Sequence, residues 1–198
     1  MKRFVFGVDL DGVCGDYLYS LRNYMAGTGN PLPEVEATSW DLVKAGLFPD
    51  RESYNQAHKD AVLNGIFTSM PELSGVSDAL WKLSDNEIHI RVVTHRLGAN
   101  GDHGFAVQDT VRWLQAPRPD GRPRIPFRDL CFLGTKEAIA SDLHIDDAPH
   151  VIEAMKAAGH EVLIFDAPYN RHLEGSRANS WEEVVEYVLA FRDQISEG

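Results

Sequence analysis

The chain is poor in the features that mark membrane, disulfide-rich and zinc-binding proteins. Its two cysteines, Cys14 and Cys131, lie far apart and outside any CxxC pair, so neither a disulfide framework nor a zinc site is indicated. No window approaches the roughly 18 consecutive apolar residues of a membrane span. The first apolar run is interrupted by Asp9, which argues against a signal peptide. We therefore expect a cytoplasmic protein that makes no membrane contact.

Positive charge is also scarce. The 198 residues include 19 Lys and Arg against 30 Asp and Glu, a formal net charge of −11, and this balance argues against binding of a nucleic-acid polymer. The basic stretch at residues 118–124 is interrupted by Pro and Gly, which favours a solvated loop over a nucleic-acid contact. If the substrate is an anion, local cations or a metal must overcome the negative field of the whole protein.

Strand and helix patterns alternate along most of the chain, whose length allows one domain or one domain with a small insertion. The strand patterns occupy residues 3–10, 87–95, 130–134, 142–146 and 161–168. The helical patterns occupy residues 76–85, 106–115, 149–159 and 180–195. Ser180 followed by Glu183 is typical of a helix start, and Gly159 of a helix end. The alternation predicts an α/β fold with a doubly wound parallel sheet.

One interval is too long for a simple crossover between neighbouring strands. About 60 residues separate Gly15 from the helix at 76–85, whereas a crossover needs roughly a dozen residues. The excess predicts a small helical cap at residues 16–70, inserted after the first strand, with helices near 16–27 and 51–64. The core domain would then comprise residues 1–15 and 71–198.

Residue types that carry chemistry follow three of the predicted strands. They are Asp9 and Asp11 after the first strand, Thr94 at the end of the second, Asp146 and Asp147 at the end of the fourth, and Lys136, which opens a short helix before the fourth. The carboxyl ends of parallel strands meet at one edge of a sheet, so these side chains should converge.

Clustered carboxylates need a cation or a proton. Two like charges about 4 Å apart repel by about 4 kcal/mol at an effective dielectric constant near 20, so such a cluster either protonates or recruits a positive ion. Ligands that are all oxygen favour Mg²⁺ over zinc. Each residue alone also has an ordinary explanation, as an acidic turn, a strand-end hydroxyl, a solvated lysine or a helix N-cap. Their occurrence together, in order, favours a functional site.

These motifs resemble a known superfamily. The segments "DLDGV", "VVTHR" and "DLHIDD", together with Lys136, resemble the four motifs of the haloacid dehalogenase (HAD) phosphatases, from residue 4 to about 185. The segments "GTKEAIASDLHIDDAP", "LIFDAPYNRH" and "RANSW" are similar to the cytosolic and mitochondrial 5′(3′)-deoxyribonucleotidases. The resemblance implies a HAD-like Rossmannoid core.

The resemblance also implies catalytic roles. Asp9 is expected to be the nucleophile that forms an aspartyl-phosphate. Asp11 is expected to protonate the leaving oxygen and then to deprotonate the attacking water. Thr94 is expected to hydrogen-bond a phosphate oxygen, and Lys136 to neutralise the phosphoryl group and Asp9.

The implied metal ligands are Asp9, the backbone carbonyl of Asp11, and Asp146. Asp147 is expected to orient a metal-bound water or Lys136. Asp142 is a further candidate ligand, but its place at the start of the fourth strand, remote from the carboxyl end, argues against it.

The sequence departs from the family after Thr94. The family usually has Ser there, whereas His95 and Arg96 follow in this chain. They are either local groups, at the surface or supporting the site without touching the substrate, or, for Arg96 in particular, additional contacts to phosphate or substrate. Tyr17 stands at an aromatic position of the family and is the aromatic residue of the cap most expected to face the ligand. Residues 116–127 form a longer loop than the family pattern leads us to expect, and its role stays open.

The sequence therefore predicts a Mg²⁺-dependent phosphomonoester hydrolase that acts through an aspartyl-phosphate, with a (deoxy)ribonucleoside monophosphate as the best candidate substrate. The alternatives are a HAD phosphatase for a sugar or other small-metabolite phosphate and a non-catalytic phosphometabolite-binding protein. The expected partner is a small-molecule phosphate monoester, and formation of a homodimer stays open.

Overall fold

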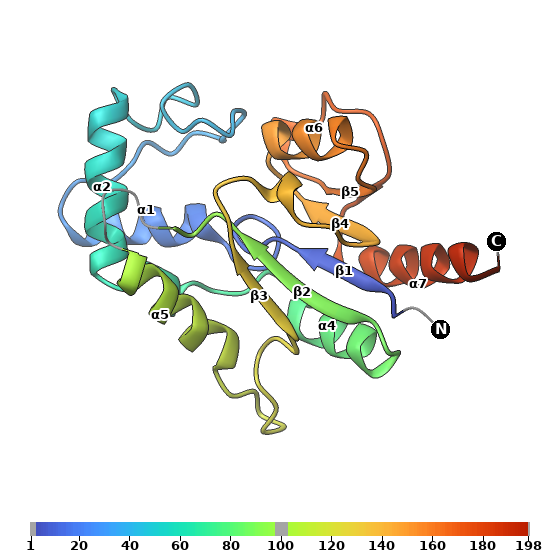
Figure 1. Cartoon of the computed structure of the whole chain (residues 1–198). Helices are drawn as coiled ribbons and strands as arrows, with labels where there is room; N and C mark the ends of the chain where they lie inside the picture. The colour runs from blue at the N-terminus through green and yellow to red at the C-terminus, as the bar shows by residue number, and fades with distance from the viewer. Residues whose placement is uncertain (1–2, 98–102, 198) are drawn as a thin grey trace.

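The strand order places the first strand at the centre of the sheet. The computed structural model describes residues 3–97 and 103–197, and within these ranges six parallel strands follow the order β3-β2-β1-β4-β5-β6 (Figure 1). The strands are β1 (Val5–Val8), β2 (His89–Thr94), β3 (Asp129–Phe132), β4 (Leu143–Asp146), β5 (Val162–Phe165) and β6 (Arg177–Ala178). The α-helices are α1 (Tyr17–Gly27), α2 (Arg51–Leu63), α3 (Ile66–Ser69), α4 (Val76–Asp85), α5 (His103–Gln115), α6 (Pro149–Ala157) and α7 (Trp181–Glu197), and the short 3₁₀ turns are η2 (Lys136–Ala138) and η3 (Pro168–Asn170).

Helices cover both faces of the sheet, as the alternating side chains of β5 show. Val162 and Ile164 pack in a cluster with Ile152 of α6. Leu163 and Phe165 belong instead to the main core, with Trp181 of α7. Because successive side chains of a strand point to opposite faces, α6 and α7 lie on opposite sides of the sheet. The predicted α/β doubly wound fold is confirmed.

The predicted elements are present with shifted ends. All five predicted strands form, each shorter than its apolar pattern, and the two-residue β6 and the four-residue α3 were not predicted. Gly159 ends α6 with a positive φ of 85°, while the N–H of His160 reaches back to the carbonyl of Met155. Ser180 precedes α7, and its hydroxyl accepts from the N–H of Glu183. The residues that marked the end of α6 and the start of α7 in the sequence therefore predicted helix ends better than the apolar patterns predicted strand ends.

The segment between β1 and α4 has a hydrophobic cluster of its own. Leu21 of α1, Val62 of α2 and Phe67 of α3 contribute to it, together with Phe48 from the intervening loop. Ala106 of α5 belongs to the same cluster, so the segment packs on the sheet domain through α5. The helices expected near 16–27 and 51–64 are α1 and α2, whereas the domain boundaries at residues 15 and 70 stay a prediction.

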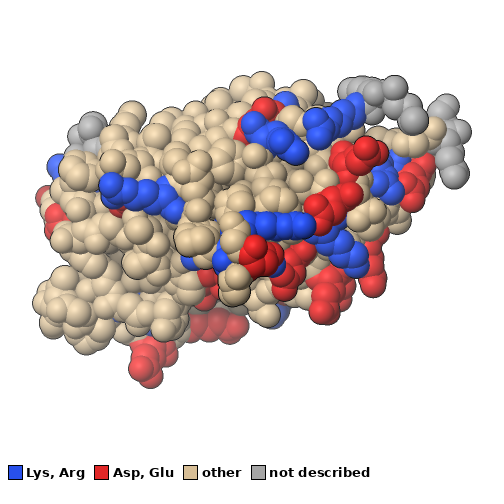
Figure 2. All heavy atoms as spheres, turned by 90° about the horizontal axis from the view of Figure 1, so that it is seen from below, with Lys and Arg blue, Asp and Glu red and all other residues tan. Residues whose placement is uncertain are grey.

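The arginines of residues 118–124 lie beside acidic partners. Arg118 pairs with Asp78 at 2.6 Å, and Arg122 with Asp85 at 3.0 Å. Figure 2 shows the face seen from below, where Lys and Arg are interspersed with Asp and Glu. This pairing fits the predicted solvated loop.

Across the described ranges, none of the helices has the length and apolar character needed to cross a membrane.

Candidate active site

Three neighbouring strands bring the predicted site residues to one edge of the sheet. Asp9 directly follows β1, and its N–H donates to the carbonyl of Ile145 in β4 at 3.2 Å. Asp146 ends β4, and Thr94 ends β2, the strand on the other side of β1. Asp9, Thr94 and Asp146 are all buried. The predicted residues therefore lie together because the carboxyl ends of parallel strands meet at one edge of the sheet.

Lys136 binds two of these carboxylates at once. Its Nζ lies 2.6 Å from Asp9 Oδ1 and 2.7 Å from Asp146 Oδ2, and its side chain is only 3% exposed. Burial opposes the positive charge, but Asp146 and Asp9 raise the pKa of Lys136 above its usual value. The ammonium is therefore retained inside the protein.

Burial makes the carboxylates reluctant to ionise. It raises the pKa of Asp9 to about 7; Lys136 opposes this rise, while Asp146 and Asp11 add to it. Burial also raises the pKa of Asp147 well above its usual value, and Asp146 and Asp9 reinforce the effect. The cluster thus carries more buried carboxylate than Lys136 neutralises, which is the electrostatic condition for binding a further cation.

The geometry of the carboxylates also suits a cation. Among the described residues, Asp9, Asp146 and Asp147 each offer an oxygen, and the three oxygens lie within 4.8 Å of one another. Asp147 Oδ2 accepts from the hydroxyl of Tyr169, whereas Asp147 Oδ1 is buried and has no hydrogen-bond partner in the described part of the chain. An all-oxygen set with an unsatisfied buried atom fits a hard divalent cation.

This cluster differs in composition from the expected ligand set. Asp147 contributes a carboxylate to it, although the sequence suggested that Asp147 only orients a water or Lys136. Gly12, with φ of 84°, lies against this carboxylate, so that a Cβ at Gly12 would overlap it.

Two other predicted acids have no carboxylate in the cluster. The side chain of Asp11 is outside it, and the expected role of its backbone carbonyl stays a prediction. Asp142 accepts from the N–H of Val5 at 2.8 Å, at the amino end of β4, as expected for a residue outside the site.

Arg96 pairs with Asp11, which is the place of a group that supports the site, one of the alternatives that the sequence left open. Its side chain is 1% exposed, with Nε 2.9 Å from Asp11 Oδ2 and Nη2 2.7 Å from Asp11 Oδ1. The guanidinium therefore makes a two-bond ion pair with Asp11, and Arg96 also lines the cavity described below. His95, by contrast, is exposed at the edge of the site.

A cavity of about 530 Å³ lies beside these residues. Asp11, His95 and Asp147 line it from the sheet domain, and Tyr17 is part of the opposite wall. Aromatic or imidazole side chains that the sequence did not single out as ligand contacts also line it, namely Trp40, Tyr54, His58, Phe67, Phe165 and Tyr169. The cavity thus joins a charged end to an aromatic wall.

Three of these unexpected side chains had a readable signal. Tyr54 and His58 are four residues apart on α2 and therefore share one helix face; His58 also accepts or donates a hydrogen bond at 2.7 Å with the hydroxyl of Tyr17. Tyr169 follows the carboxyl end of β5, and polar groups at such strand ends lie near the site.

Trp40 had no such signal. It lies in the loop between α1 and α2, and its ring packs edge-on against His150 of α6, with centroids 4.4 Å apart. In Figure 1 this loop reaches toward α6.

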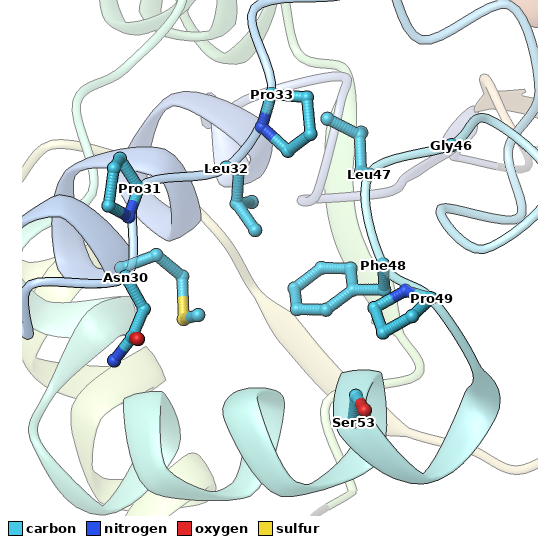
Figure 3. A pocket seen from close by; sticks show the side chains of 10 residues that line it. Asn30, Pro31, Leu32, Pro33, Gly46, Leu47, Phe48, Pro49 and Ser53 are labelled. Carbon is cyan, nitrogen blue, oxygen red and sulfur yellow. The ribbon is translucent and has the colours of Figure 1, made fainter.

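A second cavity, of about 770 Å³, lies within the inserted segment. Figure 3 shows Leu32, Phe48 and several prolines around it. None of its lining residues is ionisable. Although it is larger, its lining offers small polar groups such as Asn30 and Ser53 but no charged group to bind or transform a charged substrate, so volume alone does not identify the functional site.

The fold is that of HAD-superfamily hydrolases of known structure. A HAD-superfamily hydrolase of subfamily IA from Geobacter sulfurreducens superimposes with a TM-score of 0.57 at 16% identity, covering 94% of this chain and 96% of that chain. A provisionally assigned HAD hydrolase from Bacillus subtilis, bound to magnesium, has a TM-score of 0.57 at 14% identity, covering 96% of this chain and all of that chain. At these identities the likeness shows the fold.

The sequence comparisons define the family. The model of the family described as "5′ nucleotidase, deoxy (Pyrimidine), cytosolic type C protein" matches residues 3–194. A Chlorobaculum tepidum protein, provisionally named 5′(3′)-deoxyribonucleotidase, is 36% identical over 193 residues, which is 96% of this chain and 92% of that protein. The chain belongs to this 5′-nucleotidase family. Both resemblances noted in the sequence are confirmed, and the protein is an enzyme of the phosphatase class.

Proposed function

We propose that the protein is a Mg²⁺-dependent 5′-nucleotidase that hydrolyses (deoxy)ribonucleoside monophosphates through a phosphorylated Asp9. The observation that carries this proposal is the contact of buried Lys136 with Asp9 and Asp146, next to a cavity with an aromatic wall. The provisional name of the Chlorobaculum tepidum protein supports the substrate class.

Asp9 acts as the nucleophile in the first step. Lys136 occupies Asp9 Oδ1, which leaves Oδ2 to attack phosphorus. As the new Oδ2–P bond forms, the bond from phosphorus to the ester oxygen breaks and its electron pair goes to that oxygen. Asp11 gives the oxygen a proton, so that the nucleoside leaves as a neutral alcohol.

Water then releases the phosphate. Asp11, now ionised, takes a proton from the water as its oxygen attacks phosphorus, and the bond between Asp9 and phosphorus breaks. The carboxylate of Asp9 and the neutral acid of Asp11 are both restored. Lys136 remains charged and stabilises the transferred phosphoryl group, with the hydroxyl of Thr94 as a further donor.

Asp9, Asp146 and Asp147 would hold the metal, since their oxygens converge and Asp147 Oδ1 has no other partner in the described part of the chain. When bound, Mg²⁺ supplies positive charge that neutralises the carboxylates and the phosphoryl oxygens. The magnesium bound to the related Bacillus subtilis fold supports the choice of ion.

The aromatic wall favours a nucleotide over a sugar phosphate. A nucleobase stacked on an aromatic ring gains about 1–3 kcal/mol. Residues 16–70 would act as the cap that brings Tyr17 and its neighbours over the phosphate site and excludes water.

A substrate panel tests this proposal. The protein is assayed for phosphate release from ribo- and deoxyribonucleoside 5′-monophosphates, 3′-monophosphates, sugar phosphates and p-nitrophenyl phosphate, with Mg²⁺ and with excess chelator. We expect Mg²⁺-dependent release with the highest kcat/KM for a nucleoside monophosphate. Equal or higher kcat/KM for sugar phosphates would overturn the nucleotide assignment, and full activity in chelator would overturn the metal assignment.

A further inference from the structure

Arg96 carries a buried charge that the proposed reaction leaves without a role. It lies two residues after Thr94, and its N–H donates to the hydroxyl of Thr94 at 3.2 Å. Nε and Nη2 contact the two oxygens of Asp11 at 2.9 and 2.7 Å. The Arg96 side chain is 1% exposed and that of Asp11 is 32% exposed. The pair thus has one end fixed inside the protein and one end facing the cavity.

The guanidinium is held from several sides. Nη1 donates to the hydroxyl of Thr110 at 3.4 Å, and Nη2 lies 3.5 Å from Met70 Sδ. The ring of Phe67 lies 4.3 Å from the guanidinium carbon, and the ring of Trp113 lies 5.7 Å from it. Because side chains from both the inserted segment and α5 enclose it, Arg96 has little freedom to move relative to the sheet.

We propose that Arg96 is a positioning residue that aims the carboxyl group of Asp11 at the leaving oxygen, and this inference rests on the proposed function. The planar guanidinium donates through two nitrogens in a fixed fork, which sets the plane of the carboxylate as well as its position. An ammonium is a point charge and fixes position without fixing the plane.

Proton transfer is compatible with this pairing. When Asp11 is neutral, one oxygen carries the proton that goes to the leaving oxygen, and the other still accepts from Arg96. After the transfer, both oxygens accept from the guanidinium again. Arg96 stays protonated throughout, so it orients the acid and exchanges no proton itself.

Two substrates with different leaving groups separate this role from a merely structural one. A nucleoside leaves as an alkoxide unless Asp11 protonates it, whereas p-nitrophenolate is a stable anion that leaves without a proton. The comparison uses kcat/KM, which reports the steps up to departure of the leaving group and therefore excludes the later attack of water. Asp11→Asn sets the reference pattern, a large loss with the nucleotide and a much smaller loss with p-nitrophenyl phosphate.

Arg96→Lys should reproduce that pattern in weaker form. We expect kcat/KM for the preferred nucleotide to fall about 10- to 100-fold, part of the 10²- to 10⁴-fold that a positioned acid contributes. The value for p-nitrophenyl phosphate should change less than about 3-fold, and the nucleotide KM should change little. Arg124→Lys is the matched control, because Arg124 also lies over Trp113, at 4.7 Å, but pairs with Glu72 instead of Asp11.

Thr110→Val provides a second test if Arg96→Lys does not fold. It keeps the side-chain shape, removes the acceptor of Nη1, and lies outside the cavity lining. We expect the same selective loss with the nucleotide, about 3- to 10-fold.

An equal loss with both substrates would overturn the positioning role and leave Arg96 as a packing residue. A rise in KM alone would make it a substrate contact. If instead the wild type is inactive, or Asp11→Asn retains full activity with the nucleotide, the proposed function fails, which is a different result from a non-selective Arg96 variant.

Discussion

The two cavities of this protein differ in what surrounds them more than in size. The cavity of about 530 Å³ lies beside Asp11 and Asp147 and has aromatic side chains on its other wall. The larger cavity, of about 770 Å³, is lined by apolar side chains, prolines and small polar groups of the inserted segment. Ligand sites combine an apolar wall with a few convergent polar groups, and this combination distinguishes the smaller cavity as functional.

The two cavities also differ in how they relate to the sheet. The smaller one adjoins the carboxyl ends of β1, β2 and β4, where three strands deliver charged groups to one place. The larger one lies within the loop and helices between β1 and α4. Substitutions at the two cavities should therefore separate catalysis from stability, and the following changes test that separation.

The largest effect is expected from Asp9→Asn. The amide cannot act as the nucleophile, so turnover of the preferred nucleotide should fall by several orders of magnitude while the protein stays folded. Phosphate release and circular dichroism measure the two properties. An Asp9→Asn protein that kept a tenth of wild-type turnover would contradict the covalent mechanism.

Removal of the metal should have the next largest effect. We expect excess chelator to reduce activity to background and added Mg²⁺ to restore it, whereas Ca²⁺, which takes six to eight ligands and binds carboxylates bidentately, should inhibit. Mg²⁺ should also raise the melting temperature of the wild type, because an ion that binds only the folded state stabilises it. Asp147→Asn should weaken both responses, and an undiminished thermal shift in this variant would remove Asp147 from the metal site.

Tyr17→Ala tests the aromatic wall. Loss of a stacked base costs about 1–3 kcal/mol, which corresponds to a rise in the nucleotide KM of roughly 5- to 150-fold. Hydrolysis of p-nitrophenyl phosphate should change much less. Tyr17→Phe is the matched control, since it keeps the ring and removes only the hydroxyl that contacts His58 at 2.7 Å. If Tyr17→Ala reduces both activities equally, Tyr17 is a packing residue.

The smallest kinetic effect is expected in the larger cavity. Phe48 is 6% exposed and belongs to the hydrophobic cluster of the inserted segment. Phe48→Leu should lower the free energy of unfolding in urea by about 1 kcal/mol, as a conservative core substitution does, with kcat and KM near wild type. A rise in the nucleotide KM like that of Tyr17→Ala would show that the two cavities serve one site.

Strand-end residues were predictable because the rule that places them is local. Asp9, Thr94 and Asp146 each end an apolar run, and parallel strands bring such ends together whatever lies between them. The same reasoning set Asp142 apart, since it begins the strand that Asp146 ends. Tyr169 obeys the rule as well and could have been found after the fifth strand.

Arg96 was not predictable in this way. Its position two residues after Thr94 was visible, but its burial depends on Phe67 and Met70 from the inserted segment and on Thr110 from α5, which are distant in sequence. The sequence left open a surface group, a group that supports the site and a substrate contact, and packing made it the partner of Asp11. Likewise, the contact of Trp40 with His150 joins a loop to a helix more than a hundred positions later.

The sequence by itself determined the α/β fold, the superfamily and the edge at which the carboxylates and Lys136 meet, because periodicity and strand ends are properties of short stretches. The tertiary structure alone decided which carboxylates converge, with Asp147 beside Asp9 and Asp146, and that Arg96 is the partner of Asp11. Ion pairing and burial depend on distances of a few ångströms between residues far apart in the chain. Those distances are set by the packing of the whole core.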